Sequence, residues 1–389
     1  MAELLLAGTT SGAHERLAAS IGRAMPLWSV RQVTGADGLL QEVTQRKNHY
    51  DLVLAGFEQP EAFEPVFDAC RTASPQTLRF AAFDAVLPAQ VPFAHQVLAI
   101  PERIEAIHPV LAAGVEVAER ACAHPTLARI VANLHDVPSP PVLYFDVREQ
   151  VEQRHGDLAG MADVASRDPS LVARILRVAN SGFYGLPRSI SNLSEAVGLI
   201  GTDALLGMVL AAQLYSGLPP PGLNLEVLWQ HTLQVSSLAK QIAALEGADR
   251  TAQGEAAIAG LLHDLGIMVL LENEPAQYQP MWHKAAGDES RLAELEREAF
   301  GTTHGELGAL ILKLWSLPEA VIDAVAHSHT VDHIDAPGLS VQARAVLAAE
   351  WLLASSGADV PEPLESVDQG VLASWQGECE RVLSSGLSL

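Results

Sequence analysis

The hydrophobic pattern of the chain changes once, near residue 120, and this change limits the folds open to it. Before that point, short apolar runs typical of strands alternate with amphipathic segments of helical period, which predicts a parallel sheet flanked by helices. After about residue 125 the strand-like runs stop, and a period of 3.6 residues continues to the C-terminus. We therefore expect an α/β domain followed by an all-helical domain, and 389 residues is long enough for two domains or more.

The composition is that of a globular protein and argues against some partners. Hydrophobic residues make up 49% of the chain and aromatic residues 5%, a balance that favours helices over sheets. The 47 acidic residues outnumber the 24 basic ones, which gives a formal net charge of −23. Because the basic residues are scattered singly, this charge would repel a phosphate backbone, and we expect no nucleic-acid partner.

Cysteine usage and the N-terminal residues indicate a cytoplasmic protein. The three cysteines, Cys70, Cys122 and Cys379, lie far apart, so neither a disulfide framework nor a zinc knuckle is expected. The apolar run at the N-terminus is too short for a signal peptide and lacks a basic segment. Polar residues, Gly or Pro interrupt the longer apolar stretches before about 18 residues, so we expect no membrane span.

The first 120 residues contain strand candidates with helix candidates between them. The strand candidates are 3–8, 28–33, 51–57, 78–85 and 96–101, and the helix candidates are 12–24, 36–47, 61–73 and 102–120. This rhythm predicts a flavodoxin-like domain over residues 1–120, with a different small α/β domain as the alternative. The segment "YDLVLAGFEQP" at 50–60 resembles the part of the receiver domain of two-component response regulators that carries the phospho-accepting aspartate.

The residues at the reactive receiver positions differ from those of the family. Gly56 stands where receivers carry the phospho-accepting aspartate. Gly8 and Thr9 replace the acidic pair that binds magnesium, Ala82 replaces the hydroxyl residue, and Ile100 replaces the lysine. Without carboxylates to hold Mg²⁺, phosphoryl transfer lacks its charge neutralisation. We therefore expect a receiver-like domain that cannot be phosphorylated.

Four motifs after residue 125 stand in the order and spacing of a known helical domain. They are "VPSPPVLYFDV" (137–147), "SRDPSLVARILRVANSGFYGLPRSISNLSEAVGLIG" (166–201), "LWQHT" (228–232) and "GLLHDLG" (260–266). In the second motif, Asp168 and Pro169 are expected to begin a helix and Gly201 to join two others. The four motifs resemble the HDOD domain, an all-helical signalling-output relative of the HD phosphohydrolases. The resemblance implies an HDOD domain over residues 125–335 and a helical extension packed on it over 336–389.

The resemblance also implies a set of metal ligands. In the HD superfamily a histidine, an adjacent His-Asp pair and a later aspartate gather around a divalent metal that activates water. The matching positions are His231, His263, Asp264 and, in place of the aspartate, Glu350, whose side chain is one methylene longer. If His263 and Asp264 are adjacent on one helix, they point about 100° apart, so both could reach an ion that lies between two helices.

Two more histidines match the variant with two metals, the HD-GYP type. His304 and His329 would be its further ligands. That type has paired histidines, whereas Ser328 separates His327 from His329 in this chain. It also has a lysine where this chain has Ile267, and a "GYP" segment that is missing here. These differences fall on the residues that carry out the chemistry.

The His263–Asp264 pair has a structural interpretation beside the metal one. A buried polar pair must be satisfied, and hydrogen bonds to neighbouring helices would satisfy it without any ion. We favour this structural interpretation over a bound metal without turnover, and both over hydrolysis. Other conspicuous residues are given structural roles in the same way: Trp229 in the core, Phe183 and Tyr184 at a helix end, and Glu294, Glu296 and Glu298 on a solvated helix face.

The sequence therefore predicts a non-catalytic bacterial-type signalling protein that needs no cofactor. Its helical domain would act by binding other signalling proteins. A homodimer is a further possible assembly. The alternative is a metal-dependent HD-type phosphohydrolase that acts on a nucleotide or cyclic dinucleotide, with a divalent metal ion at His231, His263, Asp264 and Glu350. A third hypothesis is a receptor that binds a cyclic dinucleotide without hydrolysing it.

Overall fold

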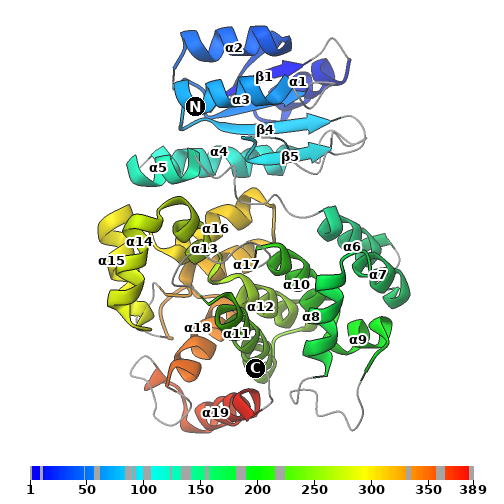
Figure 1. Ribbon diagram of the computed structural model, residues 1–389, viewed down its shortest axis with the longest axis vertical. Helices are drawn as coiled ribbons and strands as arrows, with labels where there is room; N and C mark the ends of the chain where they lie inside the picture. Colours follow the sequence, from blue (N-terminus) through cyan, green and yellow to red (C-terminus); the bar gives the residue numbers. More distant parts are fainter. Residues whose placement is uncertain are drawn as a thin grey trace. The chain divides into compact units, whose positions relative to one another are not determined.

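The computed structural model contains an α/β unit and a helical unit (Figure 1). It describes residues 2–8, 12–47, 49–56, 62–83, 91, 93–99, 107–122, 125–132, 142–153, 157–180, 190–214, 224–329, 334–355 and 364–384. The α/β unit comprises Met1–Ser139, Arg297–Thr302 and Leu310–Leu317, and the helical unit comprises Pro140–Glu296, Thr303–Ala309 and Pro318–Leu389.

The α/β unit contains a five-stranded parallel sheet in the order β2-β1-β3-β4-β5. Its strands are β1 (Glu3–Gly8), β2 (Ser29–Thr34), β3 (Leu52–Gly56), β4 (Leu78–Phe83) and β5 (Gln96–Ala99). Its helices are α1 (Gly12–Ala24), α2 (Gly35–Gln45), α3 (Phe63–Ala73), α4 (His108–Cys122) and α5 (Pro125–Ala132). Successive parallel strands joined by helices give the doubly wound arrangement, which confirms the flavodoxin-like prediction.

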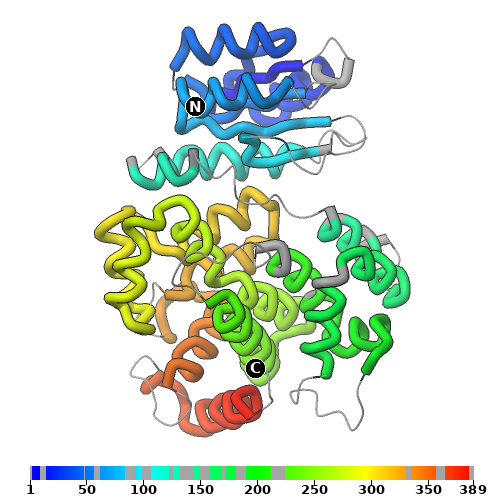
Figure 2. The backbone as a smooth tube through the Cα atoms, viewed as in Figure 1, coloured from blue at the N-terminus to red at the C-terminus, as the bar shows by residue number. Residues whose placement is uncertain are grey.

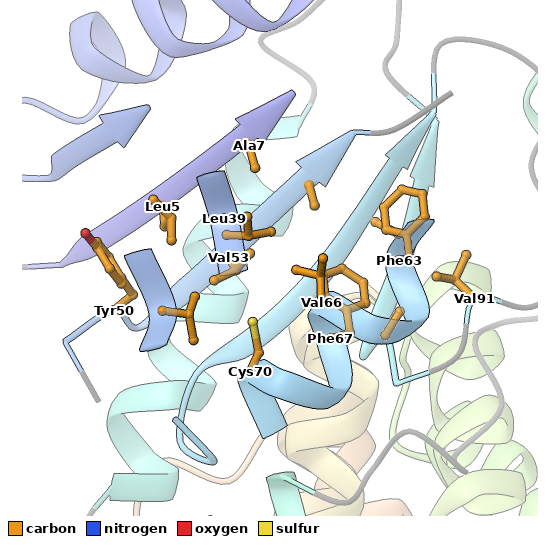
Figure 3. Packing of buried hydrophobic residues seen from close by; sticks show 14 of the residues in the cluster. Leu5, Ala7, Leu39, Tyr50, Val53, Phe63, Val66, Phe67, Cys70 and Val91 are labelled. Carbon is orange, nitrogen blue, oxygen red and sulfur yellow. The ribbon is translucent and has the colours of Figure 1, made fainter. Parts of the chain in front are cut away.

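Helices cover both faces of this sheet, which explains why its inner strands read as continuous apolar runs. On one face, Leu5 of β1 and Val53 of β3 form a cluster with Leu39 of α2 and the apolar side of α3 (Figure 3). On the other face α4 lies so close that a Cβ atom at Gly114 would come within 2.6 Å of the Leu52 side chain. The edge strand β2 is only partly buried and carries polar residues.

The carboxyl edge of the sheet carries small residues where receivers carry reactive ones. Gly8 ends β1, Gly56 ends β3, and the two glycines are partners in the register of these strands. Ala82 lies within β4. Asp51 precedes β3, at the opposite edge, where its side chain accepts a hydrogen bond of 2.8 Å from the Glu3 amide. The other two positions compared above, Thr9 and Ile100, lie outside the described residues.

The described part of the second unit is helical throughout, as the period of 3.6 residues predicts. Its first helices are α6 (Val142–Gln153), α7 (Leu158–Ala165), α8 (Pro169–Ala179), α9 (Leu193–Ile200), α10 (Thr202–Leu214), α11 (Leu225–Leu245) and α12 (Arg250–Leu262). They are followed by α13 (Leu265–Asn273), α14 (Pro275–Ala285), α15 (Glu289–Phe300), α16 (His304–Leu314), α17 (Glu319–His327), α18 (Val341–Ala354) and α19 (Gln369–Ser384).

The helix ends follow the signals in the sequence. Asp168 caps α8, because its side chain accepts a hydrogen bond of 3.2 Å from the Leu171 amide. Pro169 is the first residue of that helix. Gly201 joins α9 to α10 with a φ of 90°, a left-handed conformation that favours glycine.

Helix α11 packs against α12, α18 and α19 (Figures 1 and 2). Gly260 allows the close approach of α12 to α11, because a Cβ atom there would lie 2.7 Å from Cα and 2.8 Å from N of Ser236. Gly266 has a similar role at the start of α13, where a Cβ atom would overlap the backbone carbonyl of His304. Both glycines flank the His263–Asp264 pair.

One described stretch, Arg250–Asn273, is long and apolar enough to cross a membrane by length and composition. It consists of α12 and α13, and the His263–Asp264 pair interrupts it. In this structure 83% of its most apolar window is buried inside the protein, as expected for core helices.

The packing at Gly260 predicts opposite effects for two glycine substitutions. Gly260→Ala should lower the free energy of unfolding by about 1–3 kcal/mol, because the added methyl group meets backbone atoms that cannot move aside. Gly377→Ala in α19 should raise it by about 0.4–1 kcal/mol, because no atom lies within 4 Å of the added Cβ and alanine restricts the unfolded chain. Urea unfolding of both variants measures the difference, and equal effects would contradict this packing.

Candidate metal centre

The four ligands predicted from the sequence come together in the helical unit. His231 lies in α11, Glu350 lies in α18, and His263 and Asp264 lie between α12 and α13. The His263 Nε2 atom is 2.9 Å from Glu350 Oε1 and 3.1 Å from Asp264 Oδ1. The His231 Nε2 atom is 3.2 Å from Glu350 Oε1 and 3.8 Å from Asp264 Oδ2. Each of the two histidines therefore lies within 4 Å of both carboxylates.

The local structure of the pair differs from the expectation. His263 and Asp264 form a turn, because α12 ends at Leu262 and α13 begins at Leu265. The close contact of Gly266 with the backbone of His304 explains the break, since α13 must change direction to lie against the start of α16. The turn places both side chains on the same side, toward His231 and Glu350.

Three further side chains extend the cluster. The Nε2 atoms of His304 and His329 lie 3.8 Å and 3.7 Å from Asp264 Oδ1. Glu289, the first residue of α15, approaches His329 Nδ1 to 3.0 Å and His231 Nε2 to 3.8 Å. Nothing in the sequence distinguishes Glu289, because an acidic residue in the first turn of a helix is common on protein surfaces.

The ligand atoms form three groups, in each of which all atoms lie within 4.8 Å of one another. The groups are His231–His263–Asp264, Asp264–His304–His329, and His231–Glu289–Glu350. Asp264 belongs to two of them. His327 is not a member of any group, because its ring Nδ1 contacts the Asp323 backbone oxygen of its own helix at 2.8 Å. Ser328 separates the two histidines, so that His329 lies in the cluster and His327 does not.

The inward-facing atoms of this cluster have no hydrogen-bond partners. Of eleven such buried side-chain atoms in the described residues, six lie here: Nε2 of His231, His263, His304 and His329, Oδ1 of Asp264 and Oε1 of Glu350. They approach one another without the alignment that a hydrogen bond requires. Buried polar groups without an aligned hydrogen bond are costly even where ion pairs join them, so six at one place favour a shared partner. A divalent cation fits, because imidazole nitrogen and carboxylate oxygen are its usual ligands.

Three of the histidines are held in an orientation that suits metal binding. Their Nδ1 atoms lie close to oxygen: His263 at 2.8 Å from the Gly260 carbonyl, His329 at 3.0 Å from Glu289, and His304 at 2.8 Å from Glu296. An Nδ1–H that donates to oxygen leaves Nε2 as the nitrogen that a metal ion would bind once the ring has released its second proton. The Nε2 atoms of these rings face the common centre, as in metal sites where an oxygen fixes the outer ring nitrogen.

The charges of the cluster stabilise one another in the absence of a metal. Burial disfavours protonated His231, but the Glu350 and Asp264 carboxylates outweigh it and raise its pKa to about 9. Burial also disfavours protonated His329, but the Glu289 carboxylate outweighs this effect and raises the pKa of His329 to about 10. The neighbouring histidines hold the pKa of Asp264 and of Glu350 well below their usual range, although burial alone would raise them. The carboxylates are therefore ionised at neutral pH, and a metal ion bound here would displace protons from the histidines.

Glu296 corrects the prediction of a solvated face on α15. Glu294 and Glu298 are exposed as expected, whereas Glu296 is fully buried. It accepts a hydrogen bond of 2.5 Å from the Tyr278 hydroxyl and one of 2.8 Å from the His304 amide. Its burial has a signal in the sequence, because it lies four residues from the buried Leu292 and Phe300 on one helix face.

The other conspicuous residues lie outside the cluster. Trp229 is buried as predicted, with the Arg174 guanidinium carbon 4.6 Å from the centre of its ring. Ile267, at the position of the HD-GYP lysine, is an apolar core residue of α13. Phe183 and Tyr184 lie outside the described residues.

Two members of the cluster reach the protein surface. The His231 side chain is 27% exposed and that of Glu289 is 35% exposed, whereas the other members are at most 4% exposed. A ligand from solvent would approach past His231 and Glu289. A divalent ion held here would supply positive charge and could lower the pKa of a bound water.

Comparisons with known proteins agree with the sequence motifs. The family model described as the HDOD domain matches residues 137–331, a range that contains every histidine of the cluster but not Glu350. A protein of Shewanella amazonensis SB2B, provisionally named a phosphohydrolase, has a solved structure with a TM-score of 0.51 and 21% identity, covering 65% of this chain and 94% of that one. An HDOD domain protein of unknown function from Geobacter sulfurreducens has a TM-score of 0.47 and 28% identity, covering 63% and 83%.

A relative among the curated proteins is longer than this chain. An uncharacterised protein of Treponema pallidum (strain Nichols) is 24% identical over 259 residues, which are 66% of this chain and 49% of the relative. The match thus spans about half of the relative's length. The solved structure from Shewanella amazonensis is 21% identical to this chain, and at that identity the likeness shows a similar fold.

The geometry predicts that two histidine substitutions differ in their effect on metal content. His263→Ala should lose most of the bound Mn²⁺, because it removes an inward-facing ligand. His327→Ala should retain it, because that ring is 40% exposed and contacts its own helix. Asp264→Asn should also lose metal, since two ligand groups share this carboxylate. Elemental analysis after Mn²⁺ loading and desalting measures the ratio, and equal content in the two histidine variants would contradict the assignment.

Proposed function

This chain belongs to the HDOD domain family, and from that premise we propose that it is a regulatory protein of signal transduction that acts by binding other proteins. In this proposal the helical unit holds a divalent metal ion without turning over a phosphoester. The protein works in the cytoplasm, and its receiver-like unit does not accept a phosphoryl group.

The observation that carries this proposal is the apolar residue at the position of the HD-GYP lysine. Phosphoester hydrolysis builds negative charge on the phosphoryl oxygens, and enzymes of this kind neutralise it with cations in place. Ile267 is 2% exposed and cannot supply such a charge. The lysine is absent here as the phospho-accepting aspartate is absent from the α/β unit. There Gly56 ends the strand that carries this aspartate in receivers.

The metal ion is proposed from the inward-facing atoms. His231, His263, Asp264 and Glu350 would hold it, and His304 with His329 would hold a second ion that shares Asp264. A bound ion would replace the histidine protons as the source of positive charge and would give these inward-facing atoms a common partner. The residues themselves fix the ring orientations and keep the carboxylates ionised.

A metal-dependent phosphohydrolase is the second candidate, and a specific observation favours it. Asp264 belongs to two groups of ligand atoms, as expected of a carboxylate that lies between two cations in phosphoesterases. His231 and Glu289 are partly exposed, which leaves an approach for a substrate such as a nucleotide or cyclic dinucleotide.

An activity assay decides between the two candidates. The full chain is loaded with Mn²⁺ and incubated with bis(p-nitrophenyl) phosphate and, separately, with a cyclic dinucleotide. We expect no turnover above that of Asp264→Asn, because the lysine position is apolar. Steady turnover that His263→Ala abolishes and His327→Ala retains would overturn the regulatory proposal in favour of the hydrolase. Calorimetry with the same cyclic dinucleotide separates a nucleotide receptor from a protein that binds only other proteins.

A further inference from the structure

Among the described residues of the cluster, His304 is the one that the buried Glu296 carboxylate contacts. We propose that Tyr278 and Glu296 are positioning residues that fix the ring of His304, so that Asp264, His304 and His329 form a preset site for a second cation. The inference rests on the proposed metal function of the cluster. Its first part, the fixed ring, concerns the protein without metal.

Glu296 holds His304 at two points. Its Oε2 atom accepts a hydrogen bond of 2.8 Å from the His304 amide, and the ring Nδ1 lies 2.8 Å from Oε2 and 2.9 Å from Oε1. An ionised carboxylate has no proton to donate, so Nδ1 carries the hydrogen. The His304 Nε2 atom points the other way and faces Asp264 Oδ1 at 3.8 Å, too far for a hydrogen bond.

The backbone of His304 is fixed as well as its ring. His304 begins α16, whose first turn is capped reciprocally: the Thr303 amide donates to the Glu306 carboxylate, and the Thr303 hydroxyl accepts from the Glu306 amide. The carbonyl of His304 packs against Gly266, two residues after Asp264. These contacts limit the movement of the ring to rotation about its own bonds, which Glu296 restrains.

Tyr278 restrains Glu296 in turn. Its hydroxyl donates to Oε1 at 2.5 Å, and both side chains are fully buried. Burying a carboxylate completely costs several kcal/mol of solvation, and three apolar side chains of similar size could join α14, α15 and α16 at lower cost. The arrangement therefore does more than join helices, because it sets which nitrogen of His304 faces Asp264.

The test uses Glu296→Gln, Tyr278→Phe and the matched control Glu294→Gln, which changes an exposed residue on the same helix. Nitrogen-15 NMR of the metal-free protein, followed over a pH range that includes the neutral ring, reports which nitrogen of neutral His304 carries the proton. We expect Nδ1–H in the wild type and in Glu294→Gln, and a mixture of tautomers in Glu296→Gln. A merely structural role would lower stability without changing the tautomer. Tyr278→Phe, which removes one oxygen, serves if Glu296→Gln does not fold.

Calorimetric titration with Mn²⁺ tests the second part. Glu296→Gln should weaken the second equivalent of Mn²⁺ by about 10- to 100-fold, the usual effect of removing such an outer partner, and leave the first equivalent unchanged. Tyr278→Phe should act in the same direction with a smaller loss. An unchanged tautomer, or unchanged Mn²⁺ affinity in both variants, would overturn the inference.

The two proposals fail in distinguishable ways. If the wild type binds no Mn²⁺ but His304 shows a fixed Nδ1–H that Glu296→Gln releases, the metal function fails and the positioning role stands. If the wild type binds Mn²⁺ and the tautomer does not respond to Glu296→Gln, the positioning role fails and the metal function stands.

Discussion

Close packing of the segment "GLLHDLG" sets the position of every other group in the cluster. Gly260 brings α12 against α11, the helix that carries His231, and Gly266 brings the start of α13 against the backbone of His304. Between them the chain turns, and the turn directs His263 and Asp264 inward. Larger residues at either glycine would move the pair away from its neighbours, so the chemistry of the site depends on two missing side chains.

The fold was predictable where one local signal decides it. Strands buried on both faces read as apolar runs, and helix ends carry caps such as Asp168. The turn at His263 was not predictable in this way, because apolar residues flank it on both sides without a Pro. Helical period continues through such a break, and only the contact of Gly266 with a distant helix reveals it.

The residues of the candidate site likewise divide into those that a sequence signal identifies and those that it does not. His231, His263, Asp264 and Glu350 could be identified because their order in the chain resembles that of a family. Glu289 and Glu296 could not be identified from a single acidic residue in a helix, since exposed and buried carboxylates look alike in a sequence. Their positions depend on tertiary contacts with His329, Tyr278 and His304. Of these two, Glu296 carries one signal of burial, its spacing of four residues from Leu292 and Phe300 on the same helix face.

The inward-facing ligands come from segments far apart in the chain, from His231 in α11 to Glu350 in α18. An ion bound to both would cross-link this part of the chain and close a long loop, which removes conformations from the unfolded ensemble. Gain or loss of the ion would then change the rigidity of several helices together. Surfaces remote from the ion would report its presence, and a partner protein could distinguish the two states without touching the site.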